Sequence, residues 1–282
     1  MNTSLYISSG ALQAYQQKID TTANNVANVN TTGYKRKDHS FSEILASQMN
    51  NHGRANNEAG HLTPEGLRVG YGTRTGLTQI DMNQGQAMET GEPFDLMIAG
   101  NGFFQVGTVN GAADEVRYTR DGSFHLSPNP DNPGSYHLAH ANGGYLLDQN
   151  GNPIELDENY EVKIESNGQI QLKAKAGQGE AILSDQRVGI VDIQNPHMLR
   201  NVGDNQFVID PETIPAGANL ADYARMMVAG EAEISSGFLE GSNVDLMKEM
   251  TDLMTSQRTY QLNARAVSYA DQMIGIANNI LK

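Results

Sequence analysis

The fold is set by the C-terminal segment 242–282, SNVDLMKEMTDLMTSQRTYQLNARAVSYADQMIGIANNILK. Every seventh residue from Leu246 is apolar, and no proline interrupts the run. A heptad spacing kept over this length is typical of a coiled coil or of a helix packed in an array. The segment therefore predicts one long helix, for which Ser242 can serve as the N-cap, with Asp245 three residues later.

The N-terminal residues carry a matching pattern, because Leu5, Leu12, Ile19 and Val26 are also seven residues apart. The residues three positions after each complete the a and d positions of one helix face. We expect a helix capped by Thr3 or Ser4 that ends near Asn28. Two heptad helices at the ends of one chain can pair with each other and still offer apolar surface to neighbouring copies.

This pattern predicts an assembly interface on the two terminal helices. Its residues are Leu5, Leu12, Tyr15, Ile19, Val26, Leu246, Met250, Leu253, Tyr260, Val267, Ile274 and Leu281. Met247, Met250 and Met254 flank the heptad line, and methionine adapts to irregular contacts. An ordinary buried helix face would explain them too. The apolar residues cover more than one face, however, which favours an interface.

The middle of the chain has a different character. All nine prolines lie between Pro64 and Pro215, and apolar runs are separated by turn dipeptides. Strand–turn–strand patterns predict hairpins at 121–122, 150–151 and 167–168. Further strands are expected at 188–193 and 206–209.

The fold class is therefore α+β, with a paired-helix domain and a central all-β domain of short antiparallel strands. The expected boundaries are 1–33 for the N-terminal helix, 34–61 for an extended or mobile arm, 62–236 for the β-domain and 237–282 for a linker and the long helix. Within the arm we expect a short helix around Phe41–Leu45.

Charge is distributed unevenly along the chain. The net charge is −14, of which residues 1–40 contribute +2, residues 242–282 contribute zero and the centre contributes −16. An acidic centre argues against nucleic acid, whose phosphates require basic residues. Near-neutral ends suit helices that pack against copies of themselves, although an acidic surface that keeps the protein in solution explains the same charge.

Composition excludes several classes of site and sorting signal. Cysteine is absent, so no disulfide, thiol nucleophile or cysteine-ligated metal is possible. No apolar run is long enough to span a membrane. The N-terminus has no basic segment followed by an apolar one, so we expect no cleaved signal peptide.

No candidate chemistry is convincing. His137 and His140 are three residues apart in a strand-rich region, where such residues point to opposite faces. Asp148, Asn150 and Asn152 resemble the start of a calcium loop, but Pro153 stands where the loop needs glycine. We predict no catalytic residue, no metal ligand and no cofactor.

Several segments resemble bacterial flagellar rod and hook proteins. The residues that carry the N-terminal and C-terminal likeness are Asn24, Asn25, Asn28, Gly33, Tyr34, Asn243, Gln257, Arg258, Tyr260 and Asn263. Segments 96–106, 118–124 and 144–148 are similar to the central β-domain of the family. Segment 66–73 is most similar to distal rod proteins, and the proximal rod and hook-type proteins are the alternatives.

The resemblance implies a D0 domain that pairs the terminal helices and a β-rich D1 domain. It implies a structural subunit, not an enzyme, that assembles into a helical tube and transmits motor torque to the hook. Its partners would be further copies, other rod and hook proteins, the type III export apparatus and ring proteins around the rod, with no nucleic acid and no small-molecule substrate. Its location would be the flagellar basal body, in the cell envelope and periplasmic space.

The pair Phe41 and Leu45 fits the aromatic–x-x-x–aliphatic pattern that such export substrates present at the export gate. A small apolar contact would explain the same two residues. A secreted β-domain that binds a ligand or cell wall, with helices that serve only to dimerise it, is the alternative from another class. A hydrolase of wall polymers is a third hypothesis.

Overall fold

The computed structural model describes residues 2–43, 47–49, 67–69, 72–107, 116–129, 132–157, 160–174, 182–209, 223–228 and 230–280. The chain divides into two compact units. The helix unit comprises residues 1–27, 37–79 and 245–282, and the β unit comprises residues 28–36 and 80–244. The described residues 67–69 and 72–79, which we predicted to belong to the central β-domain, thus lie in the helix unit.

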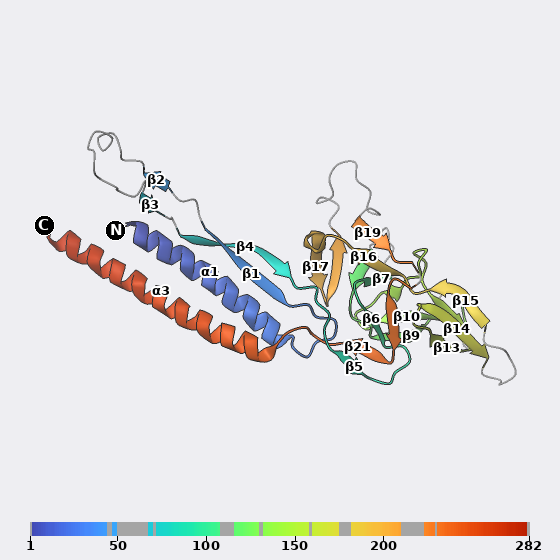
Figure 1. The fold of residues 1–282 in the computed structure, drawn as a ribbon. Coiled ribbons are helices and arrows are strands. Elements are labelled where there is room, and N and C mark those ends of the chain that lie inside the picture. Colours follow the sequence, from blue (N-terminus) through green and yellow to red (C-terminus); the bar gives the residue numbers. More distant parts are fainter. Residues whose placement is uncertain are drawn as a thin grey trace, which may run out of the picture. The chain divides into compact units, whose positions relative to one another are not determined.

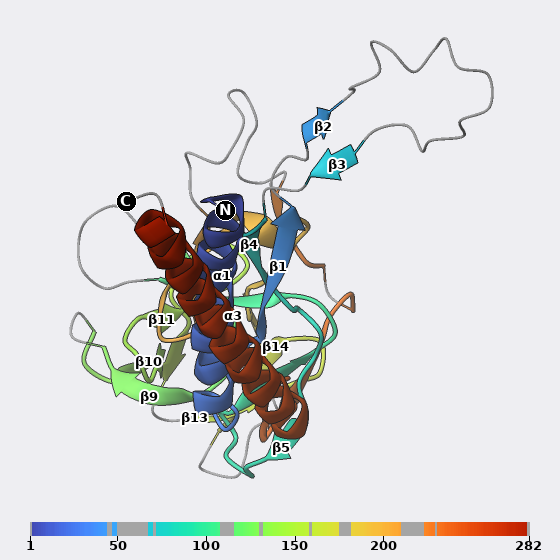
Figure 2. The same cartoon turned by 90° about the vertical axis from the view of Figure 1, so that its left-hand side faces the viewer.

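The helix unit is built on helices α1 (Asn2–Ala27) and α3 (Leu246–Ile280), which pack antiparallel along each other (Figures 1 and 2). The two chain ends therefore lie at the same end of the pair. One face of α3 is turned inward, and its buried and half-buried residues repeat with heptad spacing. They include Glu249, Leu253, Ser256, Tyr260, Asn263, Val267, Ala270, Ile274 and Ala277.

Helix α3 begins at an aspartate cap. The Asp245 carboxylate accepts the N–H groups of Met247 and Lys248 at 2.9 and 3.2 Å, which satisfies two of the free donors of the first turn. The prediction that Ser242 caps the helix was wrong. The Ser242 hydroxyl instead accepts the N–H of Val244 at 3.3 Å, before the helix begins.

Two short ribbons complete the helix unit. Strand β1 (Lys37–Glu43) pairs with β4 (Thr73–Ile80), and β2 (Ser47–Met49) pairs with β3 (Leu67–Val69). The helix that we expected around Phe41 was wrong, because Phe41 lies in β1. So short a segment cannot nucleate a stable helix alone, whereas pairing with β4 satisfies its backbone groups.

The β unit contains a ten-stranded antiparallel sheet whose main path runs β12–β10–β11–β7–β8–β18–β17. The strands of this path are β7 (Phe103–Gly107), β8 (Val116–Thr119), β10 (Ser135–His140), β11 (Tyr145–Leu146), β12 (Glu155–Asp157), β17 (Leu199–Gly203) and β18 (Gln206–Ile209). Off the path, β9 (Phe124–Pro128) pairs with β10, β16 (Ile190–Ile193) pairs with β7, and β19 (Ala224–Met226) pairs with β16. A short 3-10 helix, η2 (Pro196–Met198), precedes β17.

Three smaller sheets lie beside it in the same unit. Strands β13 (Tyr160–Ile164), β14 (Gln169–Ala174) and β15 (Ile182–Arg187) form one. Strand β6 (Leu96–Ala99) pairs with β20 (Glu233–Ser236), and β5 (Ala87–Glu89) pairs with β21 (Phe238–Glu240). The α+β class predicted from the sequence is confirmed.

Two apolar clusters form the core of the β unit. The larger includes Leu96, Phe104, Val106, Leu138, Leu146, Ile154, Ile170 and Ile234. The smaller includes Phe103, Tyr118, Val191, Ile193 and Phe207. Phe103 and Phe104 are neighbours on β7 and enter different clusters, because successive side chains of a strand point to opposite faces.

The predicted hairpins have different outcomes. Asn167-Gly168 does join the antiparallel strands β13 and β14, and a turn at Asn150-Gly151 brings Leu147 opposite Pro153. The hairpin at Asp121-Gly122 was wrong, because β8 pairs with β7 and β18 whereas β9 pairs with β10. A Cβ atom on Gly122 would overlap the Leu96 carbonyl oxygen, so this glycine permits a close backbone approach.

Candidate functional site

The side of α3 that faces away from α1 is rich in exposed apolar residues. We call this set the outer stripe, and its members are Met247, Met250, Met254, Leu262, Tyr269, Met273, Ile276 and Ile280. Their exposed fractions run from 44% at Met250 to 82% at Met247. With about 100° of rotation per residue, these positions lie about 100° to 180° around the helix from the inward line through Ser256. Soluble monomers seldom expose a large contiguous apolar surface unless it binds something.

The predicted interface residues lie mostly on the inward faces of the pair. Those that are half-buried are Leu5, Leu12, Tyr15, Ile19, Val26, Leu253, Tyr260, Val267 and Ile274. Leu246 and Met250 are exposed by 42% and 44%, and Leu281 lies outside the described residues. Most of the outer stripe was missed, although its spacing was readable: Leu262, Tyr269 and Ile276 are also seven residues apart.

The two units differ in net charge. The helix unit contains nine basic and nine acidic residues and has no net charge, whereas the β unit contains ten basic and 24 acidic residues and carries all of the −14. Copies of the helix unit can therefore approach each other without net repulsion.

The buried side-chain amide of Asn25 contacts three elements of the helix unit. The Asn25 side chain donates to the Lys37 carbonyl at 2.8 Å and to the Glu249 carboxylate at 3.1 Å, and it accepts the Lys37 N–H at 3.0 Å. Asn25 and Glu249 are each 1% exposed. One side chain thus joins the end of α1, the start of β1 and the first turn of α3.

An ionic cluster is buried in the β unit. The Glu240 carboxylate accepts from Lys35 Nζ at 2.7 Å, from the Gly85 N–H at 2.8 Å and from Arg120 Nη1 at 3.1 Å. The three charged side chains are at most 3% exposed. Burial lowers the pKa of Lys35 and of Arg120, and the attraction to Glu240 opposes that shift. The cluster is stable only because each charge has several partners.

Signature residues hold the entry and the exit of the β unit together. The Gly33 N–H donates to the Glu240 carbonyl at 2.8 Å. The Asn243 side chain accepts the Arg36 N–H at 2.7 Å and donates to the carbonyls of Asp81 and Asn83 at 2.9 and 3.0 Å. These hydrogen bonds therefore hold the segment 33–36 against the segment 240–243.

The other signature residues have less uniform positions. Tyr34 is buried, Asn28 accepts the Thr31 hydroxyl at 3.1 Å, and Tyr260 and Asn263 are half-buried. Asn24, Gln257 and Arg258 are exposed. Sequence reasoning missed Lys35, Arg120 and Glu240 as a cluster, although Lys35 and Glu240 stand inside or beside the signature segments.

The two histidines have different partners. His137 Nδ1 lies 3.2 Å from the Ile154 carbonyl oxygen, whereas His140 Nε2 lies 3.5 Å from the Asp121 carboxylate. Within the described ranges no group of three potential ligands could hold a metal ion.

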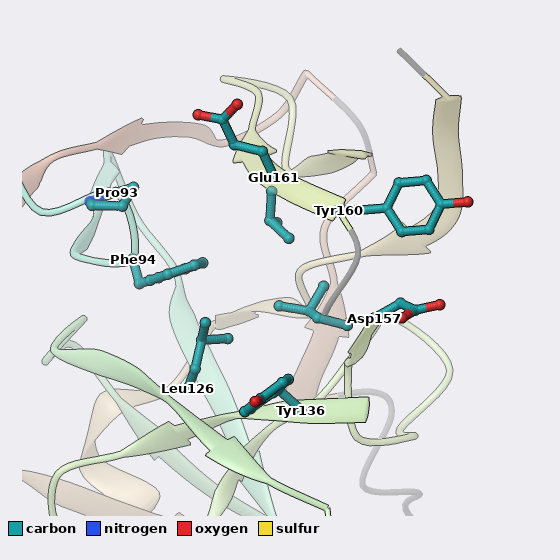
Figure 3. Close-up of a pocket in the computed structure, with 9 residues that line it drawn as sticks. Pro93, Phe94, Leu126, Tyr136, Asp157, Tyr160 and Glu161 are labelled. Atoms are coloured by element: carbon teal, nitrogen blue, oxygen red, sulfur yellow. The ribbon is translucent and has the colours of Figure 1, made fainter. Parts of the chain in front are cut away.

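A cavity of about 430 Å³ lies in the β unit (Figure 3). Phe94 and Leu126 point into it, and the carboxylate of Glu161 points away. Its described lining is mainly apolar, and the charged side chains in it are those of Asp157 and Glu161. Among the helices that the structure describes, none is both long and apolar enough to span a membrane.

Comparison with known proteins gives three family matches. The flagella basal body rod protein model matches residues 5–35, the flagellar hook protein FlgE/F/G D1 domain model matches 97–172, and the flagellar basal body rod FlgEFG protein C-terminal model matches 235–280. These ranges contain most of the segments on which the resemblance rested.

Full-length relatives agree. The chain is 36% identical over 287 residues to the flagellar hook-basal body complex protein FlhP of Bacillus subtilis, with 99% of this chain and 100% of that protein covered. It is 31% identical to the flagellar basal-body rod protein FlgG of Agrobacterium fabrum, with 99% of each covered. It is 29% identical to FlgG of Bacillus subtilis, with 97% of each covered.

Proposed function

Because the chain belongs to the flagellar basal-body rod protein family, we propose that it is a distal rod subunit whose copies pack through the outer stripe of α3 into a helical tube. The chain is a structural subunit of the rod, located in the basal body, and rod subunits assemble with other rod and hook proteins. We propose further that it has no catalytic activity and that the tube carries torque to the hook.

The observation that carries this proposal is the outer stripe. Fully burying one large apolar side chain contributes about 1.5–3 kcal/mol. Eight side chains that are already partly covered in the subunit would contribute about 10 kcal/mol, which is comparable with the ~4–15 kcal/mol cost of association. One such contact is therefore marginal, and several neighbours at once make it stable, as in a tube.

The assignment to the distal rod rests on two further points. The relatives named FlgG or FlhP align with this chain nearly from end to end, so no large central insertion distinguishes it from them. Segment 66–73 also resembles distal rod proteins. A proximal rod or hook-type protein would be built on the same outer stripe and remains the second candidate.

The route to the rod is a further part of the proposal. We infer that the type III apparatus exports the chain without a cleaved signal peptide, and that ring proteins surround it in place. Phe41, the first residue of the export-gate candidate, is 40% exposed on β1, and its ring centroid lies 5.5 Å from that of Tyr15. Leu45 lies outside the described residues. Phe41→Ala should reduce secretion if this residue is read at the gate.

The test of assembly uses two triple variants of the helix pair. Leu262→Lys, Tyr269→Lys and Ile276→Lys together place charge in the outer stripe. Gln13→Lys on α1 and Gln257→Lys and Asn278→Lys on α3 place the same charge at exposed polar positions outside the outer stripe.

In a strain that lacks its own copy, the stripe variant should abolish motility and leave basal bodies without a complete rod by electron microscopy. The control variant, with its charges outside the stripe, should swim. Monomer melting temperatures should stay close to the parent's for both. Complete rods built by the stripe variant would rule out the outer stripe as the contact between copies.

A further inference from the structure

Half of the outer stripe is methionine. Met247, Met250, Met254 and Met273 are exposed by 82%, 44%, 52% and 54%. The chain has no cysteine, so methionine thioethers are its only sulfur groups. An exposed thioether is open to oxidation by peroxides, and the product is a polar sulfoxide.

We propose that these four methionines are oxidation sites through which hydrogen peroxide blocks assembly of the free subunit. In each step the thioether sulfur gives up two electrons and gains one oxygen atom from peroxide. The O–O bond breaks, and the other oxygen leaves as water. The inference rests on the proposed function, since it takes the outer stripe to be the contact between copies.

The physical reason is the cost of covering a sulfoxide with apolar side chains. Its oxygen is a strong hydrogen-bond acceptor, and of the other stripe residues only Tyr269 carries a donor, one hydroxyl for four sulfoxides. A buried polar group without a partner costs enough to weaken binding by about tenfold. Each oxidised methionine that the contact covers should therefore raise the concentration needed for assembly by about tenfold.

The folded subunit should survive the same oxidation. The four side chains face away from α1, so a sulfoxide there leaves the inward face of the helix pair unchanged. Two methionines of the β unit provide internal references. Met97, on β6, is only 8% exposed and should resist peroxide, whereas Met88, on β5, is 45% exposed and should react without affecting assembly.

The experiment uses the purified full chain and hydrogen peroxide. Peptide mass spectrometry maps the sulfoxides, catalase removes the oxidant, and assembly is measured by sedimentation and electron microscopy. The protected variant carries Met247→Leu, Met250→Leu, Met254→Leu and Met273→Leu, and the matched control carries Met88→Leu. Methionine sulfoxide reductases A and B with a dithiol reductant provide a repair step.

We expect oxidised parent and oxidised Met88→Leu chains to lose assembly, with helical circular dichroism retained, and the fourfold leucine variant to keep it. Repair should restore the parent. The inference is wrong if parent chains with sulfoxide at all four sites assemble at the original concentration, or if repair restores nothing. It is also wrong if peroxide disables the leucine variant equally.

The failure of the proposed function would look different. The untreated parent and the untreated leucine variant would then both stay monomeric. In that case both the proposed function and this inference would be wrong. If only the untreated leucine variant failed to assemble, the repair of oxidised parent would decide the question alone.

Discussion

The side-chain amide of Asn25 donates a hydrogen bond of 3.1 Å to the carboxylate of Glu249, and both residues are buried between the two long helices. They are separated by 224 positions in the sequence. Glu249 is a charged group within an otherwise uncharged inward line, and a buried carboxylate needs donors of this kind. The contact therefore fixes the register of α3 along α1.

Asn25→Ala should destabilise the helix unit by about 3 kcal/mol, because it leaves the Glu249 carboxylate and both backbone groups of Lys37 short of a partner. Urea unfolding followed by circular dichroism at the helix band measures the loss. The exposed neighbour provides the control, and Asn24→Ala should change stability by no more than about 0.5 kcal/mol. Equal losses in the two variants would remove the special role of Asn25.

Glu240→Gln should destabilise the β unit by about 3–5 kcal/mol, because it removes the carboxylate that pairs with both buried cations, Lys35 and Arg120. Differential scanning calorimetry measures the change. Glu231→Gln is the matched control, since Glu231 also pairs with an arginine, Arg225, but at the surface. That control should have the melting temperature of the parent. If Glu240→Gln also kept the parent's melting temperature, the cluster would contribute little to stability.

Acid should weaken the β unit through Asp121. Burial alone would raise the pKa of this carboxyl, but the hydrogen bond and attraction from His140, with hydrogen bonds from Thr32 and the Ser123 N–H, outweigh it and hold the pKa below its usual value. The folded state therefore favours the ionised form. Its stabilisation is fully present above the unfolded pKa of about 3.9 and is lost as pH falls through the lower folded value.

Asp121→Asn checks that sign. The variant should be less stable than the parent at pH 7, and the difference should shrink as pH falls below about 4. Urea midpoints measured across that range give the result. A difference that stays constant with pH would show that the charge of Asp121 is not the cause, and only its shape would then matter.

Gly33→Ala should destabilise the β unit by about 3 kcal/mol or more, because Gly33 has a φ of +65° and an added Cβ would overlap the Asp121 backbone nitrogen. Gly91→Ala is the control for backbone conformation. Its φ is +76°, and a Cβ there would meet nothing within 4 Å. That variant should lose only about 1 kcal/mol, and chemical denaturation of both chains separates close approach from conformation.

The sequence predicted best where a short pattern has one physical solution. The strand at 206–209 follows from a short apolar run, Phe207 to Ile209, and the hairpin at Asn167-Gly168 follows from a turn that needs a positive φ, which Gly168 has at +79°. Asp121-Gly122 is a turn dipeptide of the same kind, but there the glycine is needed for contact with Leu96. Only the packed structure distinguishes those two uses of glycine.

The sites were harder to predict, because they join distant positions. Nothing local marks Lys35, Arg120 and Glu240 as one cluster, since a charged residue is normally exposed. On α3, the strongest heptad line from Leu253 to Ile274 proved to be the inward face. Residues such as Leu262 and Tyr269 repeat with the same period, and only the position of α1 shows which line is left uncovered.

The antiparallel pairing of α1 and α3 also matters for anyone who wishes to label the protein. A fluorescent or affinity tag on either terminus would occupy the same end of the helix pair. Moving a tag from one terminus to the other would therefore not reduce steric hindrance there. The chain has no native thiol, so a cysteine introduced at Tyr6, which is 73% exposed, and another near the end of α3 would be the sole attachment points. Dyes placed there would report by energy transfer whether the tip stays closed during export or opens and then closes again.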